Sequence, residues 1–203
     1  MKKTMLSLVA LAALTACGGG QEGERNAAST DTATAPVPAE APAPAAAAPA
    51  AGGVTDPRIA HIVVTANQVD ITAGELAQTK STNPQVKEFA QRMVTDHGGV
   101  NKAATELAGR LGVTPEPNPT SQQLQQGGER NVATLRGKSG AEFDRAYAAN
   151  EVTYHQAVLD ALDQTLIPGA RNAELKALLV QTRPAFVAHL EHARQLQTAL
   201  GKN

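Results

Sequence analysis

The chain contains very few of the residues on which many exported and nucleic-acid-binding proteins depend. Cys17 is the only cysteine among 203 residues, so no disulfide can form within the chain and stability must come from a packed core. Aromatic residues make up 2% of the sequence and tryptophan is absent, which excludes an aromatic sugar-binding face and a base-stacking platform. The formal net charge is -1, so no overall field attracts nucleic acid, and we expect no nucleic-acid partner.

The first 17 residues have the pattern of a secretion signal. A cationic start, Met1-Lys2-Lys3, precedes a short apolar run, and small residues stand before Cys17. The segment Leu14-Thr15-Ala16-Cys17 resembles the lipobox of bacterial lipoproteins. This resemblance implies that residues 1–16 are a signal peptide and that the Cys17 thiol becomes lipidated. The alternative is an ordinary signal peptide with an incidental cysteine.

The signal also predicts where the protein resides. We expect a lipid-anchored protein of the bacterial cell envelope, whose partner is the membrane through Cys17; the sequence identifies no protein partner. Gly18, rather than Asp, follows Cys17, which resembles outer-membrane sorting in enteric bacteria, so we expect the domain to face the periplasm. Residues 17–55 are rich in Ala and Pro and have almost no bulky apolar side chain, which predicts a disordered spacer.

Residues 56–203 form the predicted folded domain, and its apolar residues recur with a helical period throughout. The first long helix begins at Asp56-Pro57, with Asp56 as the N-cap. The second opens at Asn83-Pro84 and ends at Gly112. The third ends at Pro168-Gly169, and the fourth runs to Leu200 with a kink at Pro184.

The connections between these helices predict their topology. The first and second helices, and the third and fourth, are joined by a few residues each, so each pair is antiparallel. About 26 residues separate the second helix from the third, and they include a weaker helical segment at 121–136 that Gly127-Gly128 interrupts. We therefore predict an all-α, ferritin-like four-helix bundle with one long crossover carrying a short extra helix.

Acids and imidazoles lie on the inward stripes of all four long helices. Seven-residue spacings from apolar neighbours place these side chains inward: Asp70, His97, Glu151, His155 and His189. His192 lies at the flank of its stripe, whereas His61 and Glu75 point outward. Counting from the turns places Glu151 level with His189, but Asp70 and His97 about one helical turn apart, a gap that side-chain reach or a kink could close.

Two interpretations of these residues remain open. The first is a metal site, because inward carboxylates and imidazoles hold two iron or manganese ions in ferritin-like proteins. The second is a buried hydrogen-bond network, Asp70 with His97 and Glu151 with His155 or His189. A di-metal bundle uses Glu-x-x-His repeats, but Val94, Val152 and His189 stand where the glutamates would be. The spacing therefore favours no cofactor. The alternative is a di-metal or mononuclear site for iron, manganese or zinc at these residues or His192.

Several motifs resemble a bacterial family, the domain of unknown function 4142. They are Asp70-Ile71-x-x-Gly74-x-Leu76-Ala77, Asn83-Pro84-x-Val86-Lys87-x-Phe89-Ala90-x-x-Met93-Val94-x-Asp96-His97-x-x-x-Asn101, Phe143-Asp144-x-x-Tyr147 and His189-Leu190-x-x-Ala193. The resemblance covers about residues 56–200 and implies an exported, ferritin-like bundle without an established reaction. Asp70 stands where members typically carry Glu.

Two functional hypotheses follow. The first is a non-enzymatic envelope module with a structural, interaction or stress-associated role, and no catalytic residue is assigned. The second is a metal-binding redox or storage protein that uses the inward acids and imidazoles. The broken Glu-x-x-His spacing favours the first hypothesis.

Overall fold

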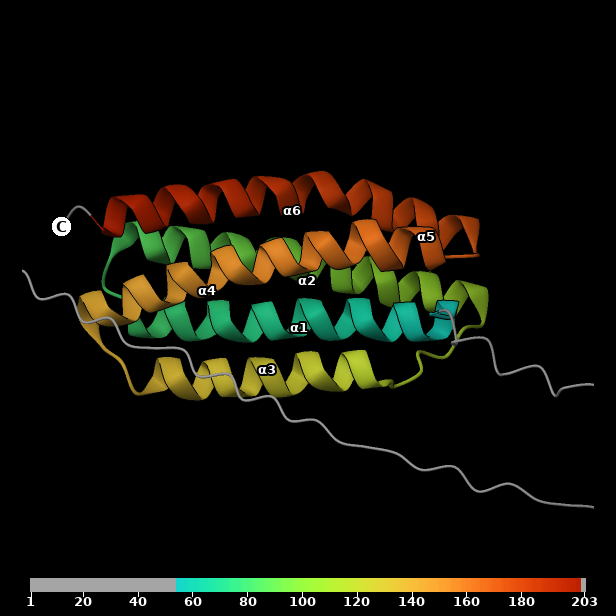
Figure 1. Cartoon of the computed structure of the whole chain (residues 1–203), viewed down its shortest axis with the longest axis horizontal. Coiled ribbons are helices and arrows are strands. Elements are labelled where there is room, and N and C mark those ends of the chain that lie inside the picture. Colours follow the sequence, from blue (N-terminus) through green and yellow to red (C-terminus); the bar gives the residue numbers. More distant parts are fainter. Residues whose placement is uncertain (1–53, 202–203) are drawn as a thin grey trace, which may run out of the picture. The chain divides into compact units, whose positions relative to one another are not determined.

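The computed structural model describes residues 54–201, so the predicted signal peptide, Cys17 and almost all of the linker lie outside the described residues. Every element within them is helical, which confirms the all-α prediction (Figure 1). The elements are α1 (Asp56–Lys80), α2 (Pro84–Leu111), α3 (Pro119–Arg136), α4 (Gly140–Ala161), the π-helical turn η1 (Leu162–Leu166), α5 (Ile167–Gly169) and α6 (Ala173–Leu200). None of these helices is long and apolar enough to cross a membrane.

The four long helices α1, α2, α4 and α6 pack side by side as a bundle. α1 contacts α2 and α4, and α6 contacts the same two helices, so α1 and α6 lie diagonally opposite each other. The crossover helix α3 runs along the outside of α1 and returns the chain to the end at which α2 began (Figure 1). As a result α4 runs parallel to α2, which is the ferritin-like topology that the connection lengths predict.

Local capping residues explain why the helices begin and end where they do. The Asn83 side chain accepts the Gln85 N–H at the start of α2, and Gly112 ends that helix in a left-handed conformation with φ 63°. Asn118 and Ser121 form a reciprocal capping box that starts α3. The predicted boundaries of α2 are therefore confirmed.

The start of α1 differs from the prediction. Thr55 is the N-cap residue, and Asp56 is already helical. The Asp56 carboxylate instead accepts the N–H groups of Arg171 and Asn172, each at 2.9 Å, so it joins the start of α1 to the start of α6. Val54 packs against the core as well, so the folded domain begins slightly before residue 56.

The prediction that Gly127-Gly128 interrupts the crossover helix is wrong, because α3 is continuous from Pro119 to Arg136. Gly128 is buried against α1, and a Cβ atom at this position would lie 2.7 Å from Cγ1 of Val69. The glycine therefore permits close packing of α3 on α1.

The core is divided into two hydrophobic clusters along the bundle. One cluster includes Ile59, Leu162 and Leu179, and the other includes Phe89 and Leu196. On α1, α2 and α4, the inward polar residues fall between the segments that supply the two clusters. The fold therefore places a polar layer at the middle of an otherwise apolar core.

Candidate metal centre

The polar layer consists of five buried side chains that come from all four long helices. α1 supplies Asp70, α2 supplies His97, α4 supplies Glu151 and His155, and α6 supplies His189. Each of these residues is at most 2% exposed to solvent. Burial of ionisable groups is unfavourable unless they are paired or bind an ion, so the contacts of each one are informative.

Asn67 orients the imidazole of His97. The Asn67 amide donates through Nδ2 to the Val63 carbonyl at 2.8 Å, which turns its Oδ1 toward His97. The Nδ1–H of His97 donates to this oxygen, with the two atoms 2.7 Å apart. The other nitrogen, Nε2, faces the centre of the layer, 2.7 Å from Asp70 Oδ2 and 3.3 Å from His155 Nε2.

His155 is held by its own helix. Its Nδ1–H donates to the Glu151 carbonyl one turn earlier at 3.0 Å, which leaves Nε2 with a lone pair directed at the layer. Burial, together with the neighbouring His97 and His189, lowers the pKa of His155 to about 4, although the Asp70 charge opposes this shift. His155 is therefore neutral near pH 7, which is the form that binds metal ions.

His189 is oriented from the edge of the bundle. Its Nε2–H donates to Asp96 Oδ2 at 2.9 Å. Burial lowers the pKa of His189, and the hydrogen bond to Asp96 opposes this shift. Its other nitrogen, Nδ1, is buried and has no hydrogen-bond partner among residues 54–201.

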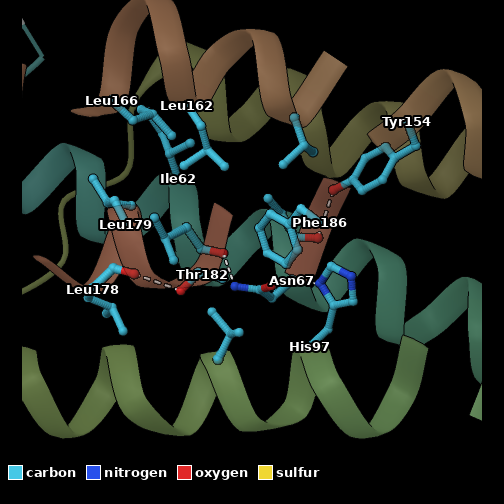
Figure 2. Close-up of a pocket in the computed structure, with 14 residues that line it drawn as sticks. Ile62, Asn67, His97, Tyr154, Leu162, Leu166, Leu178, Leu179, Thr182 and Phe186 are labelled. Carbon is cyan, nitrogen blue, oxygen red and sulfur yellow. Dashed lines mark hydrogen bonds between the residues drawn. The ribbon is translucent and has the colours of Figure 1, made fainter. Parts of the chain in front are cut away.

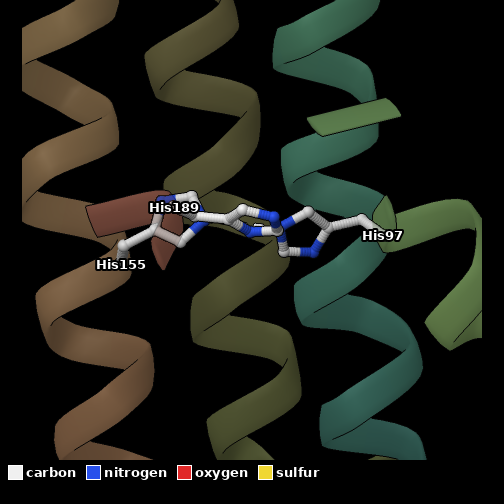
Figure 3. Close-up of side chains that lie close together, drawn as sticks. All are labelled: His97, His155 and His189. Carbon is white, nitrogen blue, oxygen red and sulfur yellow. Dashed lines mark hydrogen bonds between the residues drawn. The ribbon is translucent and has the colours of Figure 1, made fainter. Parts of the chain in front are cut away.

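Together the three imidazoles form a compact triangle. The ring centroids lie 5.5 Å apart for His97 and His155, 5.3 Å for His97 and His189, and 5.4 Å for His155 and His189. One nitrogen from each ring lies within 4.8 Å of the other two, and Figure 3 shows the rings converging from separate helices. In each ring, one nitrogen also lies at hydrogen-bond distance from an oxygen outside the triangle. Such outer partners fix the tautomer of metal-binding histidines.

The two carboxyl groups of the layer differ in protonation. Burial favours the neutral form of Asp70, but the neighbouring imidazoles, above all His97, outweigh it and lower its pKa to about 2. Burial and the Asp70 charge raise the pKa of Glu151 well above its usual value. Asp70 is therefore ionised near pH 7, whereas Glu151 keeps its proton to a higher pH than an ordinary glutamate does.

The carboxyl oxygens lack directed partners. Neither oxygen of Asp70 or Glu151 accepts a hydrogen bond in the described part of the chain. The 2.7 Å contact between Asp70 Oδ2 and His97 Nε2 has the distance of an ion pair, and it contributes to the low pKa of Asp70. The layer is therefore dense in electron-pair donors.

The structure brings together five of the six predicted metal-site residues. His192 is the exception, because it is only partly buried and its ring packs edge-on against Phe89 at 5.0 Å. Asp70 and His97, which residue counting places about one helical turn apart, meet through their side chains at 2.7 Å. Ser81 and Asn83 between α1 and α2 are extended, and extended residues rise further than helical ones, so residue counts do not give axial height.

Two residues that the sequence interpretation did not assign to the site complete it. Asn67 is four residues after Val63 on the inward stripe of α1, and this spacing could have identified it. Asp96 was visible only as the neighbour of His97, and its side chain is 42% exposed. The helical period of apolar residues in α2 does not predict that Asp96 contacts a histidine on α6.

Comparison with known proteins identifies the family. The family model described as "Domain of unknown function (DUF4142)" matches residues 40–196, and the chain belongs to this family. No curated protein matches the chain significantly. Among solved structures, the chain is similar to "CopM in the Cu(II)-bound form", with 17% sequence identity and a TM-score of 0.56. The similarity covers 71% of this chain and 98% of that chain, and at this identity it shows a shared fold.

Proposed function

We propose that this member of the DUF4142 family binds one transition-metal ion in its polar layer. His97, His155 and His189 are the nitrogen ligands and Asp70 is the carboxylate ligand. The observation that carries the proposal is the orientation of the imidazoles. Each ring has its outer N–H held by an acceptor, and one nitrogen of each ring converges on the same space.

The unpaired atoms of the layer support an ion over a hydrogen-bond network alone. The Glu151 oxygens and His189 Nδ1 make no directed hydrogen bond within residues 54–201, and Asp70 has only the imidazoles and the Glu151 carboxyl group beside it. Buried polar groups without partners are rare and unfavourable. A cation between them would supply the missing interactions, and Glu151 could become a further ligand on losing its proton.

The layer fits one ion better than two. Two groups of potential ligands exist, His97 with His155 and His189, and Asp70 with Glu151 and His155. They share His155, whose Nδ1 is occupied by the Glu151 carbonyl, so only its Nε2 can bind. One nitrogen binds one ion, and the two groups are therefore parts of a single centre.

The donor set favours copper(II) or zinc. Imidazole nitrogens suit zinc, copper, iron and nickel, and most sites bind copper(II) more tightly than the other divalent ions. The similar solved protein is described as copper(II)-bound, which supports testing this ion first. Manganese fits less well, since it prefers oxygen ligands. Because the ligands are buried, we propose that the protein holds its ion away from bulk water, lipid-anchored in the envelope through Cys17.

Metal analysis of protein purified without a polyhistidine tag tests this function. We expect about one copper or zinc ion per chain, and an increase in melting temperature when copper(II) is added to metal-free protein. The His155→Gln variant should bind no stoichiometric ion and show no copper-dependent increase in melting temperature. The His192→Gln variant should behave like the wild type in both measurements, because His192 lies outside the polar layer. A wild-type protein that binds no ion stoichiometrically, or a His155→Gln variant with an unchanged shift, would overturn the proposal.

A further inference from the structure

We infer that a small apolar cavity beside the polar layer admits dioxygen and leads it to the metal centre. The cavity has a volume of about 30 Å³ and is lined by residues of α1, α2, α4, η1 and α6 (Figure 2). One part of its wall is formed by His97 and Asn67. The inference rests on the proposed function in one respect: the metal ion that dioxygen would reach is the one proposed above.

The polar groups in the cavity wall are already occupied. The Tyr154 hydroxyl donates to the Ala66 carbonyl at 2.7 Å, and the Thr182 hydroxyl donates to the Leu178 carbonyl at 2.7 Å. The Asn67 amide is used by the Val63 carbonyl and by His97. A buried water needs two to four polar partners, so this cavity is large enough for a water molecule but unsuited to one.

The helix that forms one wall of the cavity departs from regular geometry at this point. Leu162 and Leu166 both line the cavity, and they are the two ends of the π-helical turn η1. Single π-helical turns are rare and occur frequently at functional sites. The turn is therefore a second feature, independent of the histidines, that marks this part of the bundle.

The small size and apolar lining of the cavity limit which molecules can occupy it. The space accommodates a molecule of only a few atoms, and an ion or a strongly polar molecule would lose its hydration without replacement. Dioxygen is small and apolar and needs no hydrogen bond. Among the residues that line the cavity, Val100 and Leu178 are half-buried, and His97 belongs to the polar layer.

Methyl NMR relaxation of the metal-free protein tests this inference directly. Dissolved dioxygen is paramagnetic and speeds the relaxation of nearby protons, and dinitrogen at equal pressure is the control. We expect at least a severalfold larger effect at Ile62, Leu162 and Leu179 than at Val86 and Leu196, which are as deeply buried but lie in the other cluster. Xenon, a diamagnetic competitor for dry cavities, should reduce the effect.

Two variants make the experiment specific to this cavity. Ala66→Leu adds carbon atoms at the wall and should abolish the excess relaxation, whereas Leu179→Ala enlarges the cavity and should retain it. Equal relaxation in the two hydrophobic clusters, or an unchanged excess in a folded Ala66→Leu protein, would overturn the inference. Because no metal is present in these samples, the result is independent of whether the polar layer binds an ion.

Discussion

At the scale of single residues, Asp96 connects the buried imidazoles to the surface of the bundle. Its side chain is 42% exposed, whereas that of the hydrogen-bonded His189 is 3% exposed. By accepting the Nε2–H of His189, Asp96 keeps the lone pair on the buried Nδ1. The proposed ligand therefore depends on a residue that the core does not need.

Asp96→Ala should therefore weaken metal binding and destabilise the metal-free protein only modestly. Loss of such an outer partner typically lowers metal affinity by about 10–100-fold. The free energy of unfolding of the metal-free protein should fall by no more than about 1–3 kcal/mol, because the buried Nε2–H of His189 loses its acceptor. Competition titration with a coloured chelator measures the affinity, and Asp160→Ala on the exposed face of α4 is the control. Wild-type affinity in the Asp96 variant would contradict the assigned tautomer of His189.

The polar layer also predicts how the stability of the metal-free protein depends on pH. The pKa of His155 is lowered from 6.5 to about 4, so between these values the unfolded chain binds the proton more tightly. This site alone makes the free energy of unfolding rise with pH across that range, by about 3 kcal/mol. The raised pKa of Glu151 acts in the opposite direction, because above pH 4.5 the unfolded chain releases that proton first.

Glu151→Gln should therefore give a steeper increase in stability between pH 4.5 and 6.5 than the wild type shows, because it removes the opposing site. Urea denaturation at a series of pH values measures this slope, and Glu75→Gln on the exposed face of α1 is the control. An identical slope in wild type and Glu151→Gln would show that Glu151 is not held protonated in the folded protein.

The residues of the site show what helical spacing can predict. Spacing of seven identified the five side chains of the polar layer because such a repeat keeps a residue on one face of a helix. It could not give the contacts between helices, since these depend on the extended connections and on side-chain reach. The tautomers of the three histidines depend on Asn67, the Glu151 carbonyl and Asp96, which only the folded structure brings into contact.

At the scale of helices, α3 shows how tertiary packing overrides local propensity. Two adjacent glycines disfavour a helix, and for that reason the sequence predicts an interruption there. In the fold, Gly128 meets the Val69 side chain of α1, whereas a Cβ atom at Gly127 would meet only the Arg130 side chain, at 3.9 Å. The π-helical turn η1 was likewise unpredicted, since no single residue type specifies it.

Gly128→Ala and Gly127→Ala should therefore have opposite effects. A Cβ at position 128 would lie 2.7 Å and 2.8 Å from the two methyl carbons of Val69, so α3 must move away from α1. Overpacking of this kind costs about 1–3 kcal/mol. Gly127→Ala should be neutral or stabilise the protein by up to about 1 kcal/mol, because alanine favours helix. Thermal denaturation compares the two, and equal effects would show that α3 does not depend on close contact with α1.

At the scale of the whole molecule, the N-terminal pattern predicts attachment to a membrane. Cys17 lies outside the described residues, and no helix within residues 54–201 could itself span a bilayer. Cys17→Ser should therefore be lost from the membrane fraction of cells that produce it, while wild-type protein is retained there. Immunoblots of separated membrane and soluble fractions measure this, with Ser29→Ala in the linker as the control. Continued tight association of Cys17→Ser with membranes would contradict lipidation at this position.

The division of the core by the polar layer has a kinetic consequence. Because the four proposed ligands come from four different helices, a bound ion would join all of them, and no single helix could carry it away. Release would then require the bundle to open around its middle. The rate of ion loss should approach a plateau as the concentration of a strong chelator rises, and this plateau should equal the opening rate of the amides around the layer in hydrogen exchange. Such a protein would hold its ion through slow release as well as through affinity.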